Sequence, residues 1–418
     1  MQANENIPKD EGLDNSLTLM KEGYLFIKNR MDRYHTDIFE THLMGQKVIC
    51  MTGVEAAKIF YDPERFQRKG AAPNRIQQTL FGANAIQTMD GEAHLHRKQQ
   101  FMSLMTRPHQ KELANMVVQE FEQSIHKWEL AEQVNLFEES QVILCRVACN
   151  WAGIPIQEAE VTDRAKDFIS MIYSFGDIGP EHWEGRRARN RVEDWIQQVI
   201  EDVRSDQLKP NQDYPLYAWA NFKDIDGKRL DSKMAAIELI NVIRPIVAIA
   251  TYITFGALAL RDYPQYQEKL QSRDPEELEM FAQEVRRFYP FGPFLAARVK
   301  KDFEWNNCQF EEGTLVLLDV FGLHNDPNVW EKPSEFRPER FQDREENFYD
   351  LIPQGGGDPN KGHRCPGEGI TLEIMKASID FLVNRVDYEI PAQDLSYSLS
   401  QMPTLPKSGF IINRVKQK

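Results

Sequence analysis

Hydrophobic positions recur with helical spacing over much of the chain and with strand-like spacing over only a few short pieces. An apolar residue every three or four positions is typical of a helix with one buried face, whereas short alternating or β-branched runs are typical of strands. The helical pattern covers Leu17 to Arg30, Pro108 to Trp128, Phe137 to Trp151, Arg186 to Val203 and Gly367 to Val383. The strand pattern covers Lys47 to Thr52, Arg298 to Phe303, Thr314 to Asp319 and Phe410 to Arg414. These patterns predict a mainly α protein with a small β-sheet region.

One further segment, Ile237 to Leu260, is apolar nearly all round, which predicts a helix crossing the middle of a large domain. The polar stretch Ser205 to Lys228 is expected to be a surface excursion between helices. Length alone suggests two or three domains. No linker divides the chain and no repeat is visible, so residues 1–418 are predicted to form a single domain.

Composition and charge exclude several classes of partner. With 41% hydrophobic residues the chain can bury a large core, and a net charge of −14 argues against nucleic acid. The same charge would repel an anionic substrate, which would therefore need a local positive site. The longest apolar run, Ile246 to Leu260, has 15 residues and is too short to span a bilayer. We expect no membrane anchor.

The N-terminus and the cysteines indicate a cytoplasmic protein. The polar segment Met1 to Asp14 does not have the pattern of a signal peptide. Cys145 and Cys149 share a helix face, but no partner at metal-ligand spacing lies near them, so we interpret them as buried thiols. The five cysteines have no disulfide-scaffold spacing.

Cys365 has a different setting, in Gly362-His363-Arg364-Cys365-Pro366-Gly367-Glu368-Gly369. Iron bonds a thiolate, and His363, Arg364 and the start of the following helix all favour the charged sulfur. Glycines allow a close approach of the backbone to a planar group. A structural cysteine beside a turn is the alternative for a lone cysteine.

Two more motifs precede this loop. Glu284 and Arg287 stand three apart, spaced for an ion pair on one helix face, and Phe336-Arg337-Pro338-Glu339-Arg340-Phe341 offers Arg340 to the same carboxylate. This order of motifs resembles the cytochrome P450 haem-thiolate superfamily, and His324 with Trp330 fits the same pattern. The resemblance implies the cytochrome P450 fold as a single domain, haem b (iron protoporphyrin IX) as cofactor, Cys365 as the metal ligand, and a buried Glu-Arg-Arg network behind the haem.

The cysteine loop departs from the superfamily pattern in one place. Most members carry a phenylalanine seven residues before the cysteine, whereas this chain has Asp358 there. The shielding of sulfur by that ring is therefore not expected.

The long apolar helix contains Arg244-Pro245, where oxygen-activating members carry an acid and a threonine side by side. Glu238 lies two turns earlier and Thr251 two turns later, so they cannot form that pair. A proline inside a helix costs about 3 kcal/mol, and a buried guanidinium is costly without an anion. Arg244 therefore either pairs with a carboxylate of the protein, extends its stem to the surface, or binds an anionic ligand.

Arg-Pro in this place resembles the fatty-acid peroxygenase branch of the superfamily, bacterial enzymes that use hydrogen peroxide to oxidise long-chain fatty acids near the carboxyl end. The resemblance implies hydrogen peroxide and a long-chain fatty acid as substrates and no obligatory redox partner. Arg244 and Pro245 would then be catalytic. If Arg244 binds the carboxylate, that carboxylate can act as the general acid-base, which an always-protonated arginine cannot. Cα and Cβ would be the carbons held for oxidation.

Gln87 occupies the position that distinguishes members of this branch. An alkene-forming relative has histidine there, and an amide that cannot carry a proton favours hydroxylation instead. An ordinary loop amide is the alternative. Three phenylalanines, Phe81, Phe291 and Phe294, are predicted to line the acyl tunnel, with core packing as the alternative.

In the superfamily, cations at the positions of His94 and Lys98 reach the haem propionates, and Arg68 and Arg298 are further candidates. Each of these four could instead be a solvated surface cation. His94 and Lys98 share a helix face at i, i+4.

Other functions remain open at this point. The protein could be a conventional monooxygenase served by a separate redox partner, or a decarboxylating peroxygenase that forms terminal alkenes. A non-catalytic haem sensor or fatty-acid carrier is a different class.

Overall fold

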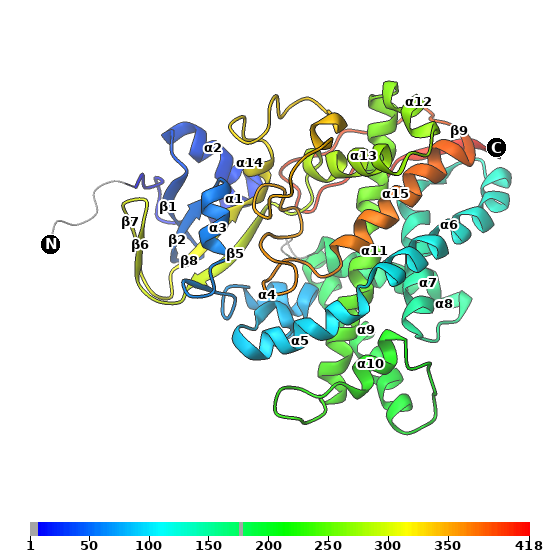
Figure 1. The fold of residues 1–418 in the computed structure, drawn as a ribbon, viewed down its shortest axis with the longest axis horizontal. Helices are drawn as coiled ribbons and strands as arrows, with labels where there is room; N and C mark the ends of the chain where they lie inside the picture. The colour runs from blue at the N-terminus through cyan, green and yellow to red at the C-terminus, as the bar shows by residue number, and fades with distance from the viewer. Residues whose placement is uncertain (1–6, 175–178) are drawn as a thin grey trace.

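The computed structural model of the chain describes residues 7–174 and 179–418. A sheet-containing region formed largely by the N-terminal part of the chain lies beside a larger helical region (Figure 1). Of the segment Met1 to Asp14, for which we expect no signal peptide, residues 1–6 lie outside the described residues.

Helices make up most of the described chain. In the first half they are α1 (Ser16–Glu22), α2 (Leu25–Tyr34), α3 (Val54–Phe60), α4 (Asn74–Ile76), α5 (Gly91–Leu104), α6 (Arg107–Leu130), α7 (Leu136–Ala152), α8 (Glu158–Tyr173) and α9 (Pro180–Arg204). In the second half they are α10 (Pro215–Asn221), α11 (Ser232–Asp262), α12 (Gln265–Gln271), α13 (Pro275–Phe288), α14 (Val320–His324) and α15 (Glu368–Asn384). Short π or 3₁₀ turns are η1 (Gln77–Phe81), η2 (Ile86–Thr88) and η3 (Pro338–Phe341).

The strands are short. They are β1 (Ile38–Leu43), β2 (Gln46–Met51), β3 (Phe66–Gln67), β4 (Val134–Asn135), β5 (Phe294–Val299), β6 (Phe303–Trp305), β7 (Cys308–Phe310), β8 (Leu315–Asp319), β9 (Val386–Glu389) and β10 (Ile411–Gln417). Five form one sheet in the order β1-β2-β8-β5-β3, in which only β2 and β8 run parallel. The mainly α architecture with a small sheet region is confirmed.

Both faces of the five-stranded sheet are covered. Alternate residues of β2 enter different apolar clusters: Val48 and Cys50 pack with the side chains of α2, whereas Ile49 and Met51 pack with those of α3. Burial on both faces explains why this strand is an almost unbroken apolar run.

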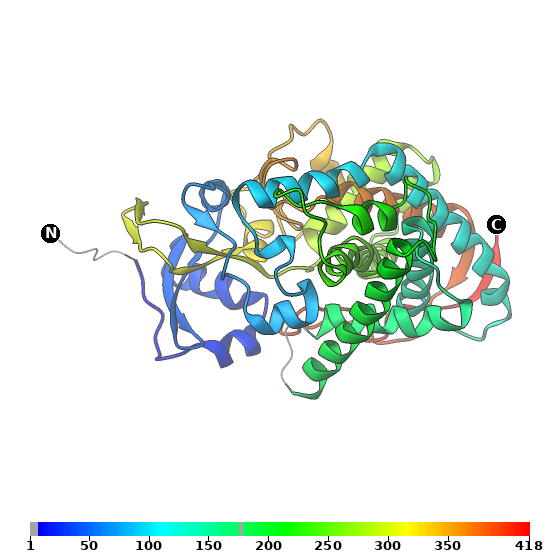
Figure 2. The ribbon, with the colours of Figure 1, turned by 90° about the horizontal axis from the view of Figure 1, so that it is seen from below.

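The long apolar segment is α11, which lies at the centre of the helical region and packs against α7, α9 and α15. In the turned view it is seen nearly end-on, with other helices around it (Figure 2). Every residue from Ala235 to Leu260 except Pro245 is buried. At 31 residues α11 is longer than the apolar run seen in the sequence, and by length and hydropathy it could span a membrane. Since 94% of its most apolar window is buried inside the protein, its apolar character belongs to the core.

Local sequence signals position the helices that carry the site. Asp231 caps α11 by accepting from the Met234 backbone N–H. Asp274 caps α13, and Pro275 follows it at the first helical position. The first turn of α13 is acidic and its last turn contains Arg286 and Arg287, which matches the direction of the helix dipole.

The prediction of one helix over Leu17 to Arg30 is wrong. The segment forms α1 and α2, which are separated at Gly23, a residue with φ of +57°. A side chain at Gly23 would overlap the Leu399 carbonyl group, so the glycine allows the C-terminal part of the chain to approach closely.

Two other boundaries also differ. Arg298 to Phe303 is not one strand, because β5 starts earlier at Phe294 to pair with β8 and ends at Val299, and β6 pairs separately with β7. The stretch Ser205 to Lys228 is not only a surface excursion, since it contains α10. Trp219 of α10 is buried, with its ring 4.8 Å from that of Phe101.

Candidate active site

Cys365 lies in the loop immediately before α15, between α5 and α13. Lys98 of α5 donates to the carbonyl of Arg364, and Arg286 of α13 pairs with Glu368. All five cysteines lie in the described ranges, and the other four are buried, whereas Cys365 is only half-buried. The loop therefore presents this one sulfur at the junction of three helices.

The charge around Cys365 differs from expectation. Burial raises the pKa of the thiol, and the Gly367 backbone N–H, Lys98 and Arg286 oppose this only in part. His363 does not contribute a positive charge, because burial lowers its pKa to about 4. Arg364 is neutralised by Glu368 at 2.6 Å. A thiolate here needs a further positive partner, which a metal ion would supply.

Lys98 and His94 lie on the same face of α5, as predicted, and both are buried. Burial lowers the pKa of Lys98 to about 8 and that of His94 to about 3, so His94 is a neutral ring at neutral pH. Its ring centre is 4.0 Å from that of His363. A neutral imidazole can still donate one N–H bond, but it cannot attract a propionate by charge.

Arg68 and Arg298 have different surroundings. Arg68 is buried over the rings of Phe60 and Tyr61, at 4.4 and 5.3 Å, and burial lowers its pKa. The guanidinium of Arg298 donates to the carbonyls of Gly70 and Gly313 and to the side chain of Gln46. Arg68 is thus a buried cation with no ion pair to any described residue, whereas the donors of Arg298 already have partners.

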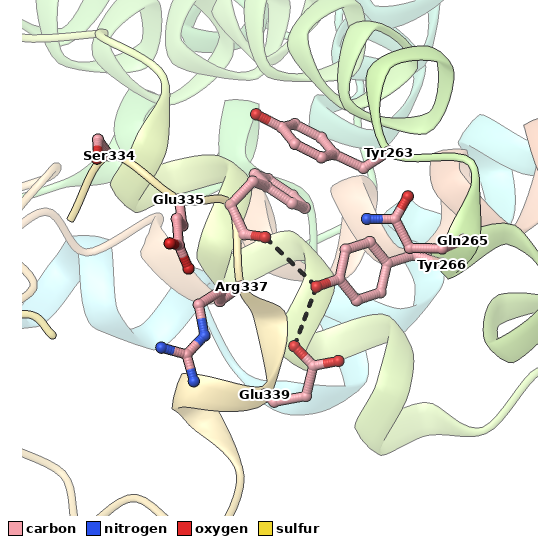
Figure 3. A pocket seen from close by; sticks show the side chains of 8 residues that line it. Tyr263, Gln265, Tyr266, Ser334, Glu335, Arg337 and Glu339 are labelled. Carbon is pink, nitrogen blue, oxygen red and sulfur yellow. Dashed lines mark hydrogen bonds between the residues drawn. The ribbon is translucent and has the colours of Figure 1, made fainter. Parts of the chain in front are cut away.

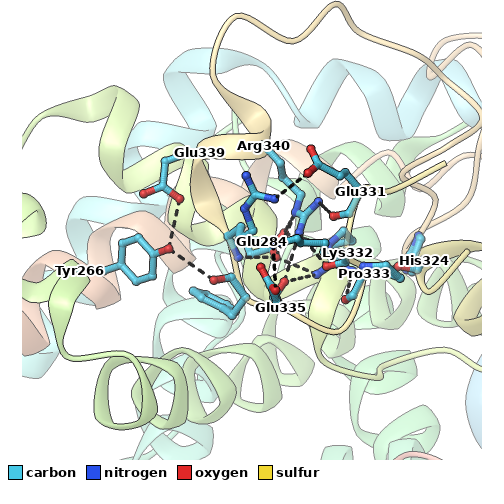
Figure 4. A network of polar contacts seen from close by, with 12 residues as sticks. Tyr266, Glu284, His324, Glu331, Lys332, Pro333, Glu335, Glu339 and Arg340 are labelled. Carbon is cyan, nitrogen blue, oxygen red and sulfur yellow. Dashed lines mark hydrogen bonds and ion pairs between the residues drawn. The ribbon is translucent and has the colours of Figure 1, made fainter. Parts of the chain in front are cut away.

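The predicted Glu-Arg-Arg network is present (Figure 4). Arg287 binds both oxygens of Glu284, at 2.7 and 2.8 Å, and Arg340 reaches the same carboxylate at 3.1 Å. The second terminal nitrogen of Arg287 donates to the carbonyls of His324 and Pro333. Glu284 and Arg287 are fully buried, so the network joins α13 to the segment around η3 and to the end of α14.

A surface hollow of about 550 Å³ lies next to this network (Figure 3). It is lined by Tyr263, Gln265, Tyr266, Ser334, Glu335, Phe336, Arg337 and Glu339. The Tyr266 hydroxyl donates to Glu339, and the Arg337 backbone N–H donates to Glu284. None of the predicted site residues lines this hollow.

Arg244 is buried on α11 at 7% exposure, and no ion pair to it exists within the described ranges. One terminal nitrogen donates to the Asn241 side-chain oxygen at 3.2 Å, and Nε has no partner. Burial and the nearby Arg189 lower its pKa to about 9, and Cys365 acts in the opposite direction. Within the part of the chain that the structure describes, Arg244 therefore has neither a carboxylate partner nor a route to the surface, which are two of its three alternatives.

Gln87 and Phe81 both contact Asn241, which also binds Arg244. The Asn241 amide donates to the Phe81 carbonyl at 2.9 Å and lies 3.5 Å from the Gln87 side-chain oxygen. The same amide lies 3.4 Å from the buried Glu238, which accepts from the Ile86 backbone N–H. These contacts bring the turn before α5 against the middle of α11.

Phe291 and Phe294 do not share one environment. The Phe291 ring stacks on Tyr252 of α11, at 4.6 Å between ring centres, two turns beyond Arg244. Phe294 starts β5 opposite Asp319 and packs against the apolar cluster that contains Phe26 and Val48.

Pro245 lies within α11 and is half-buried. Because proline has no N–H, the Asn241 carbonyl lacks its usual helical donor. Proline itself is the sequence signal for this missing helical hydrogen bond next to Arg244.

Several polar residues of the site were not predicted. Asn241 stands three residues before Arg244, a spacing that does place the two on one helix face. Arg97 pairs with the buried Glu238 at 2.9 Å. Gln354 approaches Cys365 from the same loop, 11 residues earlier, and Arg286 binds Gln354 from α13, which is distant in sequence. Neither contact has a local signal in the sequence.

The residues fit a haem with an anionic substrate nearby. Arg68, Lys98 and Arg244 are buried cations, and the described residues provide no ion pair for any of them. Buried cations are costly unless anions meet them, and haem propionates and a substrate carboxylate are anions of the right kind. No group of three or more metal-binding side chains occurs within residues 7–174 and 179–418, but haem iron needs only one protein ligand such as Cys365.

Comparisons with known proteins identify relatives over the whole chain. A family model described as cytochrome P450 matches residues 276–413. The structure of cytochrome P450EX alpha (CYP152N1) with myristic acid has 42% identity, covers 99% of this chain and 100% of its own, and superimposes with a TM-score of 0.96. A variant of cytochrome P450 OleT in complex with arachidonic acid has 37% identity, 99% coverage of both chains and a TM-score of 0.96. A variant of cytochrome P450SP alpha (CYP152B1) has 42% identity, covers 97% and 100%, and gives 0.95.

The curated relatives match over a shorter part. Cytochrome P450 3A14 from Cavia porcellus is 30% identical over 190 residues, which are 40% of this chain and 37% of that protein. Cytochrome P450 3A12 from Canis lupus familiaris is 27% identical and matches over 42% of its own length. The match therefore spans less than half of these relatives.

Proposed function

Since the chain belongs to the cytochrome P450 superfamily and, within it, to the CYP152 fatty-acid peroxygenase branch, we propose that it uses hydrogen peroxide to hydroxylate long-chain fatty acids at Cα or Cβ. The observation that carries the proposal is Arg244, a buried guanidinium on the central helix that has no anionic partner among residues 7–174 and 179–418. Two solved relatives are complexes with myristic and arachidonic acid, which supports a fatty acid as its ligand.

The cofactor is haem, and we propose the haem b form. Cys365 would bind the iron, and Lys98 and Arg68 would pair with the propionates, while His94 would donate a hydrogen bond as a neutral ring. Arg298 would take part only by giving up bonds to Gly70 and Gly313. Bound haem supplies the iron chemistry that breaks the peroxide O–O bond and oxidises a C–H bond.

Arg244 would bind the fatty-acid carboxylate with two parallel hydrogen bonds, since among the described residues Nε has no acceptor and only one terminal nitrogen donates, to Asn241. Its pKa of about 9 leaves the guanidinium charged at neutral pH. The bound carboxylate would accept a proton from one peroxide oxygen and return it to the other, because the guanidinium cannot act as a base. Holding the head group also selects Cα and Cβ for reaction.

Two residues bear on the choice between this function and a conventional monooxygenase. Glu238 is paired with Arg97, and the Thr251 hydroxyl is bonded to Tyr173 at 2.8 Å. Neither is free to relay protons to oxygen beside Arg244. This favours turnover without a redox partner.

Gln87 bears on the second alternative, alkene formation. Its side-chain oxygen faces the Asn241 amide at 3.5 Å, and an amide holds no transferable proton. We therefore propose hydroxylation as the main reaction.

A cytoplasmic location and the absence of a membrane anchor stay predictions.

The test is a reaction of the purified haem protein with a saturated long-chain acid and hydrogen peroxide, without any reductant. We expect 2- or 3-hydroxy acids by mass spectrometry. The control supplies a ferredoxin or flavodoxin system with oxygen instead of peroxide. Bleaching of haem without product, or turnover only with the reductant, would contradict the proposal. Saturable fatty-acid binding without any oxidised product would identify a carrier or sensor.

A further inference from the structure

Gln354 contacts Cys365 through both its backbone and its side chain. The Cys365 backbone N–H donates to the Gln354 carbonyl at 2.9 Å. The Gln354 side-chain nitrogen lies 3.9 Å from the Cys365 sulfur, within the range of hydrogen bonds to sulfur. The residue is half-buried, in the loop that leads to Cys365.

The neighbours of Gln354 determine which end of its amide faces the sulfur. Arg286 donates to the amide oxygen at 3.0 Å, and arginine can only donate, so this atom must be the oxygen. The amide nitrogen carries two hydrogens. One is directed to the Thr371 hydroxyl at 3.0 Å, which itself donates to the Gly367 carbonyl, and the other remains for Cys365.

The charges behind Gln354 strengthen this donor. Arg286 is 1% exposed, and its other contacts are Gln283 and Glu368. A cation bound to the amide oxygen draws electron density from the nitrogen, which makes the N–H a better donor. Glu368 in turn lies between Arg286 and Arg364. Arg286 thus acts on the sulfur through Gln354.

Asp358, the residue seven positions before Cys365, does not take this place. Its carboxylate lies 3.8 Å from the exposed Lys361, and its carbonyl accepts from Gly362. No hydrogen bond joins Asp358 to Cys365, both of which belong to the described residues. The side chain that reaches the sulfur from this loop is Gln354.

We propose that Gln354 is a positioning residue for the iron ligand, whose side-chain amide hydrogen-bonds to the Cys365 sulfur and reduces the electron donation of that sulfur to iron. The proposal rests on Cys365 as the iron ligand, as in the proposed function. A hydrogen bond to a ligating sulfur stabilises the reduced metal and raises its reduction potential. Removing it therefore favours ferric iron.

The experiment measures the ferric/ferrous equilibrium of the haem protein by spectroelectrochemical titration. We expect Gln354→Leu to retain the thiolate-type ferrous carbon monoxide spectrum and to lower the ratio of ferrous to ferric iron at a fixed potential by roughly three- to tenfold, the usual net value of one hydrogen bond. Thr371→Val is the matched control, because it alters the same amide without removing its N–H. It should leave the ratio unchanged.

Gln354→Met keeps the length of the side chain and serves if Gln354→Leu does not load haem. An unchanged ratio in a haem-loaded variant would overturn the proposal. Loss of haem from both Gln354 variants, with Thr371→Val intact, would also overturn it, since Gln354 would then hold the loop and not tune the sulfur.

If the parent protein itself lacks the thiolate spectrum, Cys365 is not the ligand and both proposals fail. Peroxide turnover is measured separately, so a failed redox result leaves the proposed activity standing.

Discussion

Arg287 and Arg244 are both buried arginines on long helices, and they differ in the acceptors that they meet. Arg287 binds both oxygens of Glu284 and three backbone carbonyls. Figure 4 shows the surroundings of Glu284. In the described part of the chain Arg244 meets one amide oxygen, and its Nε has no acceptor. A saturated guanidinium joins parts of the fold, whereas an unsaturated one retains hydrogen bonds for a ligand. The comparison therefore separates a structural arginine from a binding arginine.

The largest effect is expected at Arg287. Arg287→Met leaves Glu284 buried with only Arg340 as its charged partner, so the free energy of unfolding should fall by about 3–5 kcal/mol. Chemical denaturation of the haem protein measures this. Arg337→Met is the control, because its partner Glu331 is exposed and the pair should contribute at most about 1 kcal/mol. Equal losses of unfolding free energy in Arg287→Met and Arg337→Met would contradict the prediction that the buried pair stabilises the protein more than the surface pair.

Arg244→Met, in contrast to Arg287→Met, should reduce activity and not stability. The rate constant kcat/KM for fatty acids with peroxide should fall at least about 100-fold, which corresponds to the loss of a buried charged contact. The free energy of unfolding without substrate should stay constant or rise, since an unpaired buried charge is removed. Arg244→Lys retains charge but not the planar fork and should lose less activity. Unchanged activity in Arg244→Met would exclude Arg244 from the site.

The pH dependence of fatty-acid binding should report the charge state of Arg244. Arg244 is charged below its pKa of about 9, so fatty-acid affinity should be constant at neutral pH and fall about tenfold per pH unit above that value. The pKa of Arg244 is lower in the folded protein than in the unfolded chain. Above pH about 9 the folded protein therefore binds fewer protons at this residue, and the contribution of Arg244 to the free energy of unfolding rises with pH.

Titration of the haem absorption change with fatty acid at each pH measures the affinity. In Arg244→Lys the fall should begin at lower pH, because lysine has a lower pKa before burial. A decline at the same pH in both forms would assign it to another group.

The smallest effect is expected at Gln87, whose side chain faces Asn241, the residue that binds Arg244. Gln87→His introduces a ring that can carry a proton, so the ratio of alkene to hydroxy acid should rise by about threefold or more. Gas chromatography of both products measures it. Gln87→Asn, which is also unable to transfer a proton, should retain the original ratio. A ratio that does not differ between these variants would exclude proton transfer at this position.

Most of the helices that carry the site could be predicted from the sequence, and the failures have identifiable causes. The ranges of α6, α7 and α15 follow from apolar spacing to within two residues, whereas α9 starts at Pro180, six residues before the predicted Arg186. The break at Gly23 depends on Leu399, far away in the sequence. The start of β5 depends on its partner β8. Local patterns do not contain such contacts.

The sequence by itself determined the chemistry that is encoded in short spacings: the glycine-rich loop around Cys365, Glu284 with Arg287, and Arg244 with Pro245. Residues three or four apart on a helix, or neighbours in a loop, stay together whatever the rest of the fold does. Only the tertiary structure decided that Arg244 has no carboxylate partner among the described residues, that Glu238 is paired with Arg97, and that Gln354 reaches Cys365. Those contacts depend on side chains that are not local neighbours in the sequence, and packing decides whether a buried charge or donor meets a partner.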